Sequence, residues 1–226
     1  MKSFTGDYLQ VVHGYKHVDG DGPLKHCATD PKYLEMTRNM FSCGSVPNPA
    51  RELWVPYFEE IGKRTVDAAK DHDKVVLSHA TYQQEPRDVV IETIVKGGVP
   101  REHITILELS IDKTVKFRYL YHRTKRQFEE QGGITMEELC KGSLEWEGEE
   151  LTEEKYVKAM MDNDAKNDDP WEDCPTAKKV DVSGRDISHC DNVDKALGLT
   201  RSGEWTYQSI CDEVLPCKFC SYECMC

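Results

Sequence analysis

The sequence has no run of about 18 apolar residues, so no part of it predicts a membrane-spanning helix. Its first residues lack the apolar stretch of a secretory signal, which favours a cytoplasmic protein. Basic residues are also few, because 29 Lys and Arg stand against 41 Asp and Glu and give a net charge of -12. Binding to nucleic acid needs a basic face. We therefore expect neither a membrane nor a nucleic acid among the partners.

The acidity belongs to one segment, residues 129–173. This segment holds sixteen acids and four lysines, a balance of -12, so the rest of the chain is neutral overall. A body with balanced charge does not repel an anionic ligand such as a nucleotide. We interpret the segment as a lid or a solvated insertion, because the acidic clustering itself serves no catalytic need.

A disulfide framework is not expected either, although the chain has ten cysteines. Without a secretory signal, most of them are predicted to be reduced thiols. Five crowd residues 211–226, and three of these, Cys217, Cys220 and Cys224, have a spacing that suits Zn²⁺. A complete zinc site usually has a second cysteine pair after a longer gap, which this tail lacks. The alternatives are a zinc or iron–sulfur site, a tail of reactive thiols, and a double-prenylation terminus, which the final Cys-Met-Cys resembles.

Helix and strand patterns alternate along the body of the chain. Helices are predicted over residues 2–12, 30–40, 49–73, 86–98, 112–128 and 152–161. Strands are predicted over residues 15–18, 74–80, 103–111 and 178–184, with 74–80 the clearest buried strand. This order favours an α/β domain with a parallel sheet and helices on both faces over residues 1–184. Residues 185–226 would form a helical extension with a cysteine-rich tail.

Two aspartates, Asp19 and Asp21, flank a glycine in HVDGDGP, directly after a predicted strand. In parallel sheets, ligands bind at the carboxyl ends of the strands. A carboxylate placed there can orient Mg²⁺-bound water or accept a hydroxyl proton during phosphoryl transfer. The alternative is an ordinary polar turn, because Asp-Gly is common in turns.

Arginines follow two later elements. Arg87, in SHATYQQEPRD, stands near the first turn of a predicted helix and can hold an anionic substrate group through paired hydrogen bonds. Alternatively, it pairs with Glu85 or Asp88 on the surface. Arg123 and Arg126 belong to a basic helix end, which suits a lid over a transferring phosphate or simply complements the helix dipole.

The order of these motifs resembles the P-loop small-molecule kinases, and most closely the gluconokinase and shikimate kinase group. In that family one strand ends in a D-G-D-like motif, a later strand similar to V-V-x-S-x-A precedes an R-D pair, and an L-x-x-R helix end supplies a lid arginine. HVDGDG, VVLSHATYQQEPRD and Leu120–Arg123 match these features, with one extra residue before the R-D pair. The resemblance spans residues 2–183. It implies a P-loop NTPase-like three-layer sandwich that uses ATP and Mg²⁺ to phosphorylate a hydroxyl of a small metabolite such as a sugar acid.

The family carries G-x-x-x-x-G-K-[ST] ahead of its D-G-D strand. Lys2 lies seventeen residues before Asp19, which is the family's spacing between the loop lysine and the first aspartate. Lys2 and Ser3 therefore fall on K-[ST], while the loop glycines and the strand before them are absent. Because that strand is central in the family's sheet, we expect the true start to lie upstream of Met1. A pseudoenzyme with a rebuilt core and a chance match of spacing are the alternatives.

The resemblance implies a role for each matched residue near the nucleotide. Lys2 would contact the β- and γ-phosphates, and Ser3 would bind Mg²⁺. Asp19 would act as the base or organise the metal, and Asp21 would bind the substrate or the metal.

The arginines would complete this site. Arg87 would bind the substrate, and with Asp19 and Arg123 it would form the catalytic set. Arg126 would close over the phosphates of the nucleotide. The rival hypothesis is a catalytically inactive P-loop-like protein that binds partners through its acidic segment and its cysteine tail.

Overall fold

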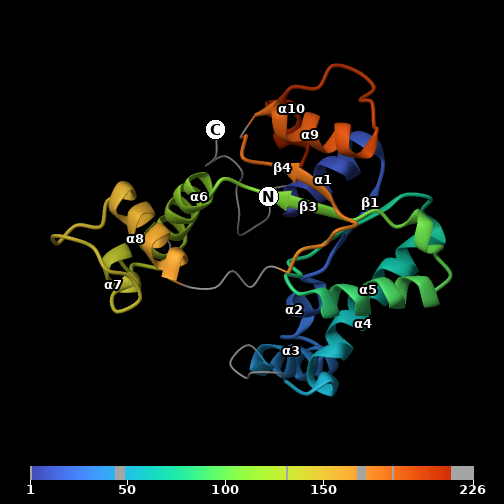
Figure 1. Ribbon diagram of the computed structural model, residues 1–226, viewed down its shortest axis with the longest axis horizontal. Helices are drawn as coiled ribbons and strands as arrows, with labels where there is room; N and C mark the ends of the chain where they lie inside the picture. The colour runs from blue at the N-terminus through green and yellow to red at the C-terminus, as the bar shows by residue number, and fades with distance from the viewer. Residues whose placement is uncertain (1, 44–48, 131, 167–171, 185, 215–226) are drawn as a thin grey trace. The chain divides into compact units, whose positions relative to one another are not determined.

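A computed structural model of the chain describes residues 2–43, 49–130, 132–166, 172–184 and 186–214. The fold is mixed α/β, and helices predominate over four short strands in the described ranges (Figure 1). The chain forms two compact units, each assembled from separate stretches of sequence. Unit 1 comprises Met1–Glu108, Trp171–Lys179 and Val193–Val214, and unit 2 comprises Leu109–Pro170, Val180–Asn192 and Leu215–Cys226.

Unit 1 contains the first strand pair and the helices around it. Its elements are α1 (Lys2–His13), β1 (Lys16–Asp19), α2 (Gly22–His26), α3 (Pro31–Ser42), α4 (Arg51–Asp71), β2 (Val75–Ser78), α5 (Gln84–Lys96), η2 (Arg101–His103) and α10 (Tyr207–Glu213). Asp30 caps α3 by accepting a hydrogen bond from the Lys32 amide, as the Asp-Pro sequence predicts. The short helix α2 was not predicted from the sequence.

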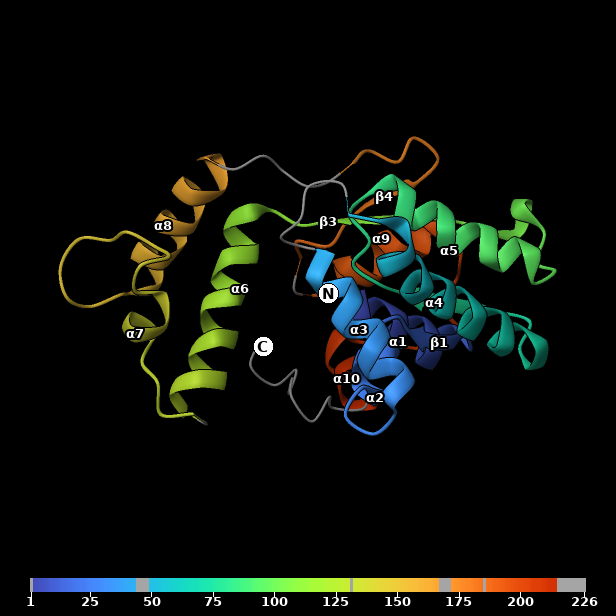
Figure 2. The same cartoon turned by 90° about the horizontal axis from the view of Figure 1, so that it is seen from below.

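The core of unit 1 lies largely between α4 and α5, which run side by side (Figure 2). Tyr57 and Ile61 from α4 pack against Val90 and Ile94 from α5. A Cβ on Gly62 would lie 2.7 Å from the Thr93 side chain, so the missing side chain lets the two helices approach closely. Burying one large apolar side chain contributes about 1.5–3 kcal/mol.

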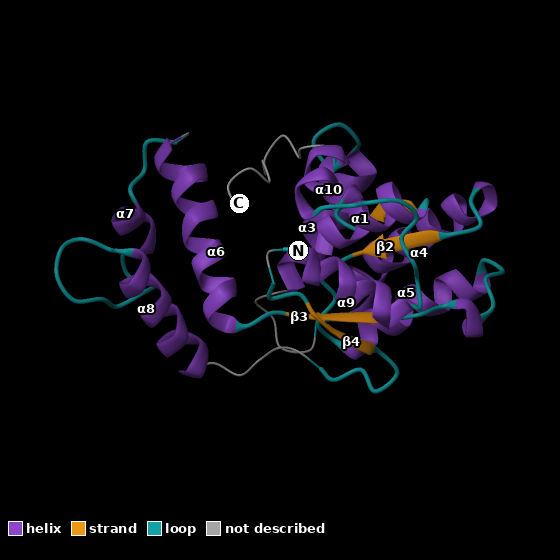
Figure 3. Ribbon diagram, turned by 90° about the horizontal axis from the view of Figure 1, so that it is seen from above, coloured by secondary structure: helices purple, strands orange, loops and turns teal. Residues whose placement is uncertain are grey.

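β1 and β2 are parallel neighbours, with Asp19 opposite Ser78. Figure 3 shows the strands in orange among the purple helices. The Gly20 amide donates to the Ser78 carbonyl at 2.9 Å, so the pairing continues into the turn after β1. In the described part of the chain β2 has no second strand neighbour, and the side chains of residues 75–77 are only half-buried. The predicted strand is confirmed, but its expected full burial is wrong because one of its edges has no neighbouring strand.

The other two strands, β3 (Leu107–Ser110) and β4 (Lys178–Asp181), form a second pair. The Lys178 amide donates to the Ile106 carbonyl at 2.9 Å, and the Val182 amide to the Ser110 carbonyl at 2.8 Å, which is a parallel arrangement. The α/β prediction is thus confirmed at the level of class. The described residues form two parallel pairs instead of the single sheet expected, because no strand among them joins β2 to the second pair.

Unit 2 holds the acidic segment. Its helical elements are α6 (Lys113–Lys125), the π-helical turn η3 (Arg126–Glu130), α7 (Met136–Cys140) and α8 (Glu153–Lys166), while α9 (Ile187–Leu197) contributes residues to both units. Tyr121 of α6 packs with Met136, Cys140, Leu151 and Tyr156 in a small apolar core. Part of the acidic segment therefore folds around a small core, because four of its residues are buried with Tyr121, while Ile134, Leu139 and Met161 stay exposed. Across the described ranges, none of the helices has the length and apolar content needed to span a membrane.

α1 packs closely on β1 at Gly6. A Cβ at this position would lie 2.3 Å from His17 Nε2, and the His17 ring is held on both sides by Asp7 Oδ1 at 2.7 Å and Ser78 Oγ at 2.8 Å. The ring therefore has little freedom to move, and only glycine fits at this point of the helix.

Gly6→Ala is expected to destabilise the protein by about 1–3 kcal/mol through this clash. Without the clash, alanine in a helix interior stabilises by roughly 0.5–1 kcal/mol relative to glycine. Urea unfolding of Gly6→Ala, alone and in a His17→Ala background, measures both effects. We expect destabilisation in the first case and a neutral or stabilising effect in the second. Equal destabilisation in both backgrounds would contradict this packing.

Candidate functional site

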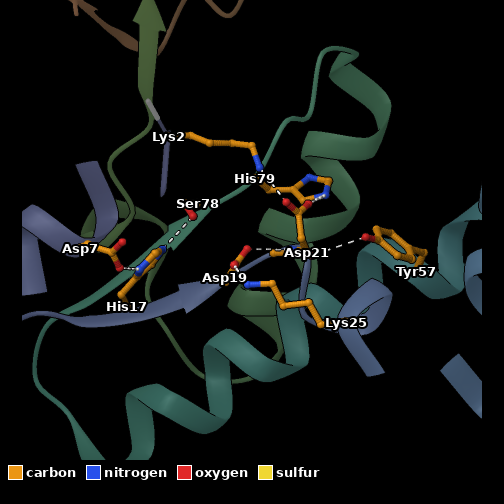
Figure 4. A network of polar contacts seen from close by, with 10 residues as sticks. Lys2, Asp7, His17, Asp19, Asp21, Lys25, Tyr57, Ser78 and His79 are labelled. Carbon is orange, nitrogen blue, oxygen red and sulfur yellow. Dashed lines mark hydrogen bonds and ion pairs between the residues drawn. The ribbon is translucent and has the colours of Figure 1, made fainter. Parts of the chain in front are cut away.

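Polar side chains gather at the carboxyl ends of β1 and β2 in unit 1 (Figure 4). Because the two strands are parallel, their carboxyl ends meet at one edge of the pair. The first residue of α1 reaches this edge, and α4 lines it. We name this group the strand-end cluster, and it consists of Lys2, Asp19, Asp21, Lys25, Tyr57 and His79.

Lys2 and Asp21 form an ion pair across the cluster. The Lys2 Nζ to Asp21 Oδ2 distance is 2.9 Å, and both side chains keep about a third of their surface exposed, at 32% and 37%. His79 Nε2 lies 3.8 Å from the other carboxylate oxygen of Asp21. The structure thus brings together a lysine and an aspartate that the family resemblance placed in one site.

Asp19 is held as an anion beside this pair. Its Oδ2 accepts from Lys25 Nζ at 2.5 Å, and its Oδ1 accepts from the Asp21 amide at 3.0 Å. Burial would raise the pKa of Asp19, but these hydrogen bonds and the charges of Lys25 and Lys2 hold it below its ordinary value. Each aspartate therefore pairs with one lysine, so the two negative charges of the cluster are balanced by two positive charges.

His79 supplies a neutral imidazole at the same edge. Burial lowers its pKa to about 4, with the Asp21 carboxylate acting in the opposite direction. Its Nδ1 lies 2.7 Å from Thr81 Oγ1, and its ring packs at 6.0 Å from the Tyr57 ring. A Cβ on Gly20 would lie 2.6 Å from the His79 ring, so the glycine between the two aspartates makes room for it.

Tyr57 closes the cluster from α4. Its hydroxyl donates to the Gly20 carbonyl at 3.5 Å. Burial, followed by the charges of Asp21 and Asp19, raises the pKa of Tyr57 to about 12. The phenol therefore stays protonated and acts as a hydrogen-bond donor near the turn.

A second polar chain runs through Asp7, His17 and Ser78 (Figure 4). This order of groups also occurs in serine hydrolases. Ser78 is only 6% exposed, however, and each residue comes from a different element, α1, β1 and β2. The chain of hydrogen bonds therefore ties α1 to both strands and so fixes the position of Lys2.

Arg87 has a different environment from the one predicted. It is 7% exposed, and its guanidinium donates to the carbonyls of Tyr82 at 3.0 Å, Glu172 at 2.5 Å and Asp173 at 3.3 Å, and to Gln84 Oε1 at 3.0 Å. These bonds join the loop after β2 to the segment before β4. The arrangement favours a structural clamp over both the substrate contact and the surface ion pair considered from the sequence.

The remaining predicted residues lie elsewhere. Ser3 follows Lys2 in the first turn of α1 and is half-buried. Arg123, near the end of α6, and Arg126, at the start of η3, belong to unit 2. The proposed zinc ligands Cys217, Cys220 and Cys224 lie outside the described residues, as does Met1.

Among the described residues, no three His, Cys, Asp or Glu side chains converge as a ligand set. Mg²⁺ commonly uses only one or two carboxylates and takes its other ligands from phosphates and water. Asp19, an anion at the strand end, fits that use.

Lys25, Tyr57 and His79 were missed in the sequence analysis. His79 had a usable signal, because it directly follows the predicted strand in VVLSHA. Lys25 and Tyr57 had none, since they reach the cluster from α2 and α4 through the tertiary fold.

Comparison with known proteins adds no assignment. The chain matches no protein-family model, no curated protein and no solved structure. The strand-end cluster and the order of the motifs are therefore the features that bear on function.

Arg87→Ala is expected to lower the free energy of unfolding by at least about 2 kcal/mol, because several buried carbonyls lose a charged donor. Urea unfolding measures the change, with Arg38→Ala on the exposed surface of α3 as the matched control. Unchanged stability of Arg87→Ala would contradict the clamp and return Arg87 to the list of candidate substrate ligands.

The low pKa of His79 makes stability depend on pH. Between pH 6.5 and about 4 the unfolded chain binds a proton at this residue and the folded chain does not. The free energy of unfolding should therefore fall as the pH is lowered through this window, by roughly 3 kcal/mol at most. His79→Gln should show a shallower fall than the wild type, and His72→Gln, an exposed control, should not. Identical pH profiles for all three proteins would refute the assignment.

Proposed function

We propose that this protein is an ATP- and Mg²⁺-dependent phosphotransferase of the P-loop small-molecule kinase class, acting on a hydroxyl of a small metabolite such as a sugar acid. One observation carries the proposal. Lys2, at the N-terminus of α1, lies 2.9 Å from Asp21 at the end of β1, with Asp19 and His79 beside it. Such a site has a phosphate-binding cation and strand-end carboxylates in contact, in the motif order of that class.

The residues divide the chemistry between them. The N-terminus of α1 and the Lys2 ammonium attract the terminal phosphates. ATP with Mg²⁺ would supply the phosphoryl group and neutralise charge on the transferring phosphate. Asp19, whose pKa is held below its ordinary value, remains an anion and would hold Mg²⁺ or its bound water. Asp21 accepts the proton of the substrate hydroxyl as the oxygen attacks phosphorus and ADP leaves.

The fold is compatible with this proposal at the level of class. It is mixed α/β, and the cluster lies at the carboxyl ends of two parallel strands, which is where such folds bind ligands.

A non-catalytic interaction protein is the second candidate. It is favoured by the closed charge pairing of the cluster, in which Lys2 neutralises Asp21 and Lys25 neutralises Asp19. In such a protein the two ion pairs would stabilise the turn after β1, and the lysines would not bind a phosphate.

Binding of MgATP separates the two candidates. Lys2→Ala is expected to weaken MgATP binding at least tenfold in calorimetry, because the cation at the helix N-terminus is lost. Lys16→Ala, at the exposed start of β1, is the matched control and should bind like the wild type.

Transfer of phosphate from ATP to a panel of hydroxylated acids tests the chemistry. Asp21→Asn is expected to reduce the transfer rate by roughly 10²–10⁴-fold without weakening MgATP binding, because Lys2 then no longer pairs with a carboxylate. A wild-type protein that neither binds MgATP nor transfers phosphate would leave the interaction role as the conclusion.

A further inference from the structure

The turn after β1 is in contact with a third cation, Arg64 of α4. A Cβ on Gly22 would lie 2.2 Å from Arg64 Nη1, so the guanidinium touches the backbone next to Asp21. Tyr57 and Arg64 lie seven positions apart on one face of α4, and Tyr57 contacts the same turn at the Gly20 carbonyl. Helix α4 therefore presents both a phenol and a guanidinium to the turn that carries the two aspartates.

Arg64 differs from the two lysines of the strand-end cluster in its hydrogen bonding. Lys2 and Lys25 are each engaged with an aspartate. The Nε of Arg64 lies 3.5 Å from Glu60 Oε1, but Glu60 already accepts from the Tyr33 hydroxyl at 2.9 Å and from Lys32 Nζ at 3.0 Å. Among the described residues, the two terminal nitrogens of Arg64 have no hydrogen-bond partner.

The guanidinium is also oriented and accessible. It lies over the Tyr33 ring at 5.0 Å, which restricts its plane, and its side chain is 26% exposed. A fixed planar guanidinium with two available nitrogens suits a carboxylate, which it binds through two parallel hydrogen bonds. Arg87, which was expected to serve this purpose, instead binds backbone carbonyls.

We propose that Arg64 binds the carboxylate of the substrate, so that the site selects hydroxylated acids over neutral polyols. The proposal rests on the proposed function, because the substrate hydroxyl would face Asp21 in the same cluster. Arg64 is the specificity-determining residue, and Glu60 and Tyr33 are the positioning residues that hold its guanidinium.

The test uses gluconate as the acidic probe and sorbitol as a neutral polyol of the same carbon number. Calorimetry measures the binding of each to the whole protein, without nucleotide. We expect the wild type to prefer gluconate. Arg64→Ala should weaken gluconate binding by roughly 10–100-fold, because a charge-assisted pair of hydrogen bonds is lost. Sorbitol binding should not change, and Arg38→Ala is the matched control.

A second variant keeps the positive charge of Arg64 and changes only the position of its guanidinium. Gly22→Ala puts a methyl group where the guanidinium lies and displaces it from the turn, and because the methyl group meets only the Arg64 side chain and no backbone, the fold can accept it. We expect weaker gluconate binding and an unchanged thermal unfolding midpoint. Loss of folding in Arg64→Ala would therefore not remove the test.

The outcomes separate this inference from the proposed function. The inference is overturned if both Arg64→Ala and Gly22→Ala still bind gluconate as the wild type does. It is also overturned if the wild type binds gluconate and sorbitol equally, or if the wild type does not bind gluconate. In each case MgATP binding and transfer to another substrate would still stand. Conversely, failure to bind MgATP overturns the kinase assignment, while the gluconate measurement still decides the role of Arg64.

Discussion

The parallel register of β1 and β2 is the constraint on which the strand-end cluster depends. It sets Asp19 opposite Ser78, and the hydrogen bond from the Gly20 amide to the Ser78 carbonyl fixes the turn that follows. A slip of one residue would send each side chain to the other face of the pair. His17, held between Asp7 and Ser78, then links this register to α1. The place of Lys2 is thus decided by hydrogen bonds well away from its ammonium.

Charge balance makes this close arrangement possible. Two carboxylates in one turn would repel each other, and a half-buried charge without a partner is unfavourable. Lys2 and Lys25 each neutralise one aspartate, and burial keeps His79 uncharged at neutral pH. Both lysines already pair with an aspartate, so an anion that binds Lys2 must displace the Asp21 carboxylate from it. An anion that binds the terminal nitrogens of Arg64 does not have to displace a carboxylate.

The sequence predicted those parts of the structure that depend on local rules. The cap of α3 by Asp30, the strand at VVLS and the alternation of helices and strands follow from turn chemistry and periodicity. The family resemblance placed Lys2 and Asp21 in one site, and the structure has them in contact. The environment of Arg87 could not be predicted, because its partners Glu172 and Asp173 are more than eighty positions away. Arg64 was missed for a similar reason, since its contact with Gly22 depends on how α4 packs.

Among the described residues, only one edge of β2 is paired with another strand, so the two edges of β2 differ in chemical behaviour. The carbonyls of Lys74 and Ser78 accept hydrogen bonds from β1. Because backbone groups alternate along a strand, those of Val75 and Leu77 point to the opposite side. Neighbouring amides in one short strand would therefore exchange their protons with water at very different rates, slowly where β1 protects them and quickly at the next residue. The same alternation leaves β2 with donors and acceptors spaced to fit one more extended chain.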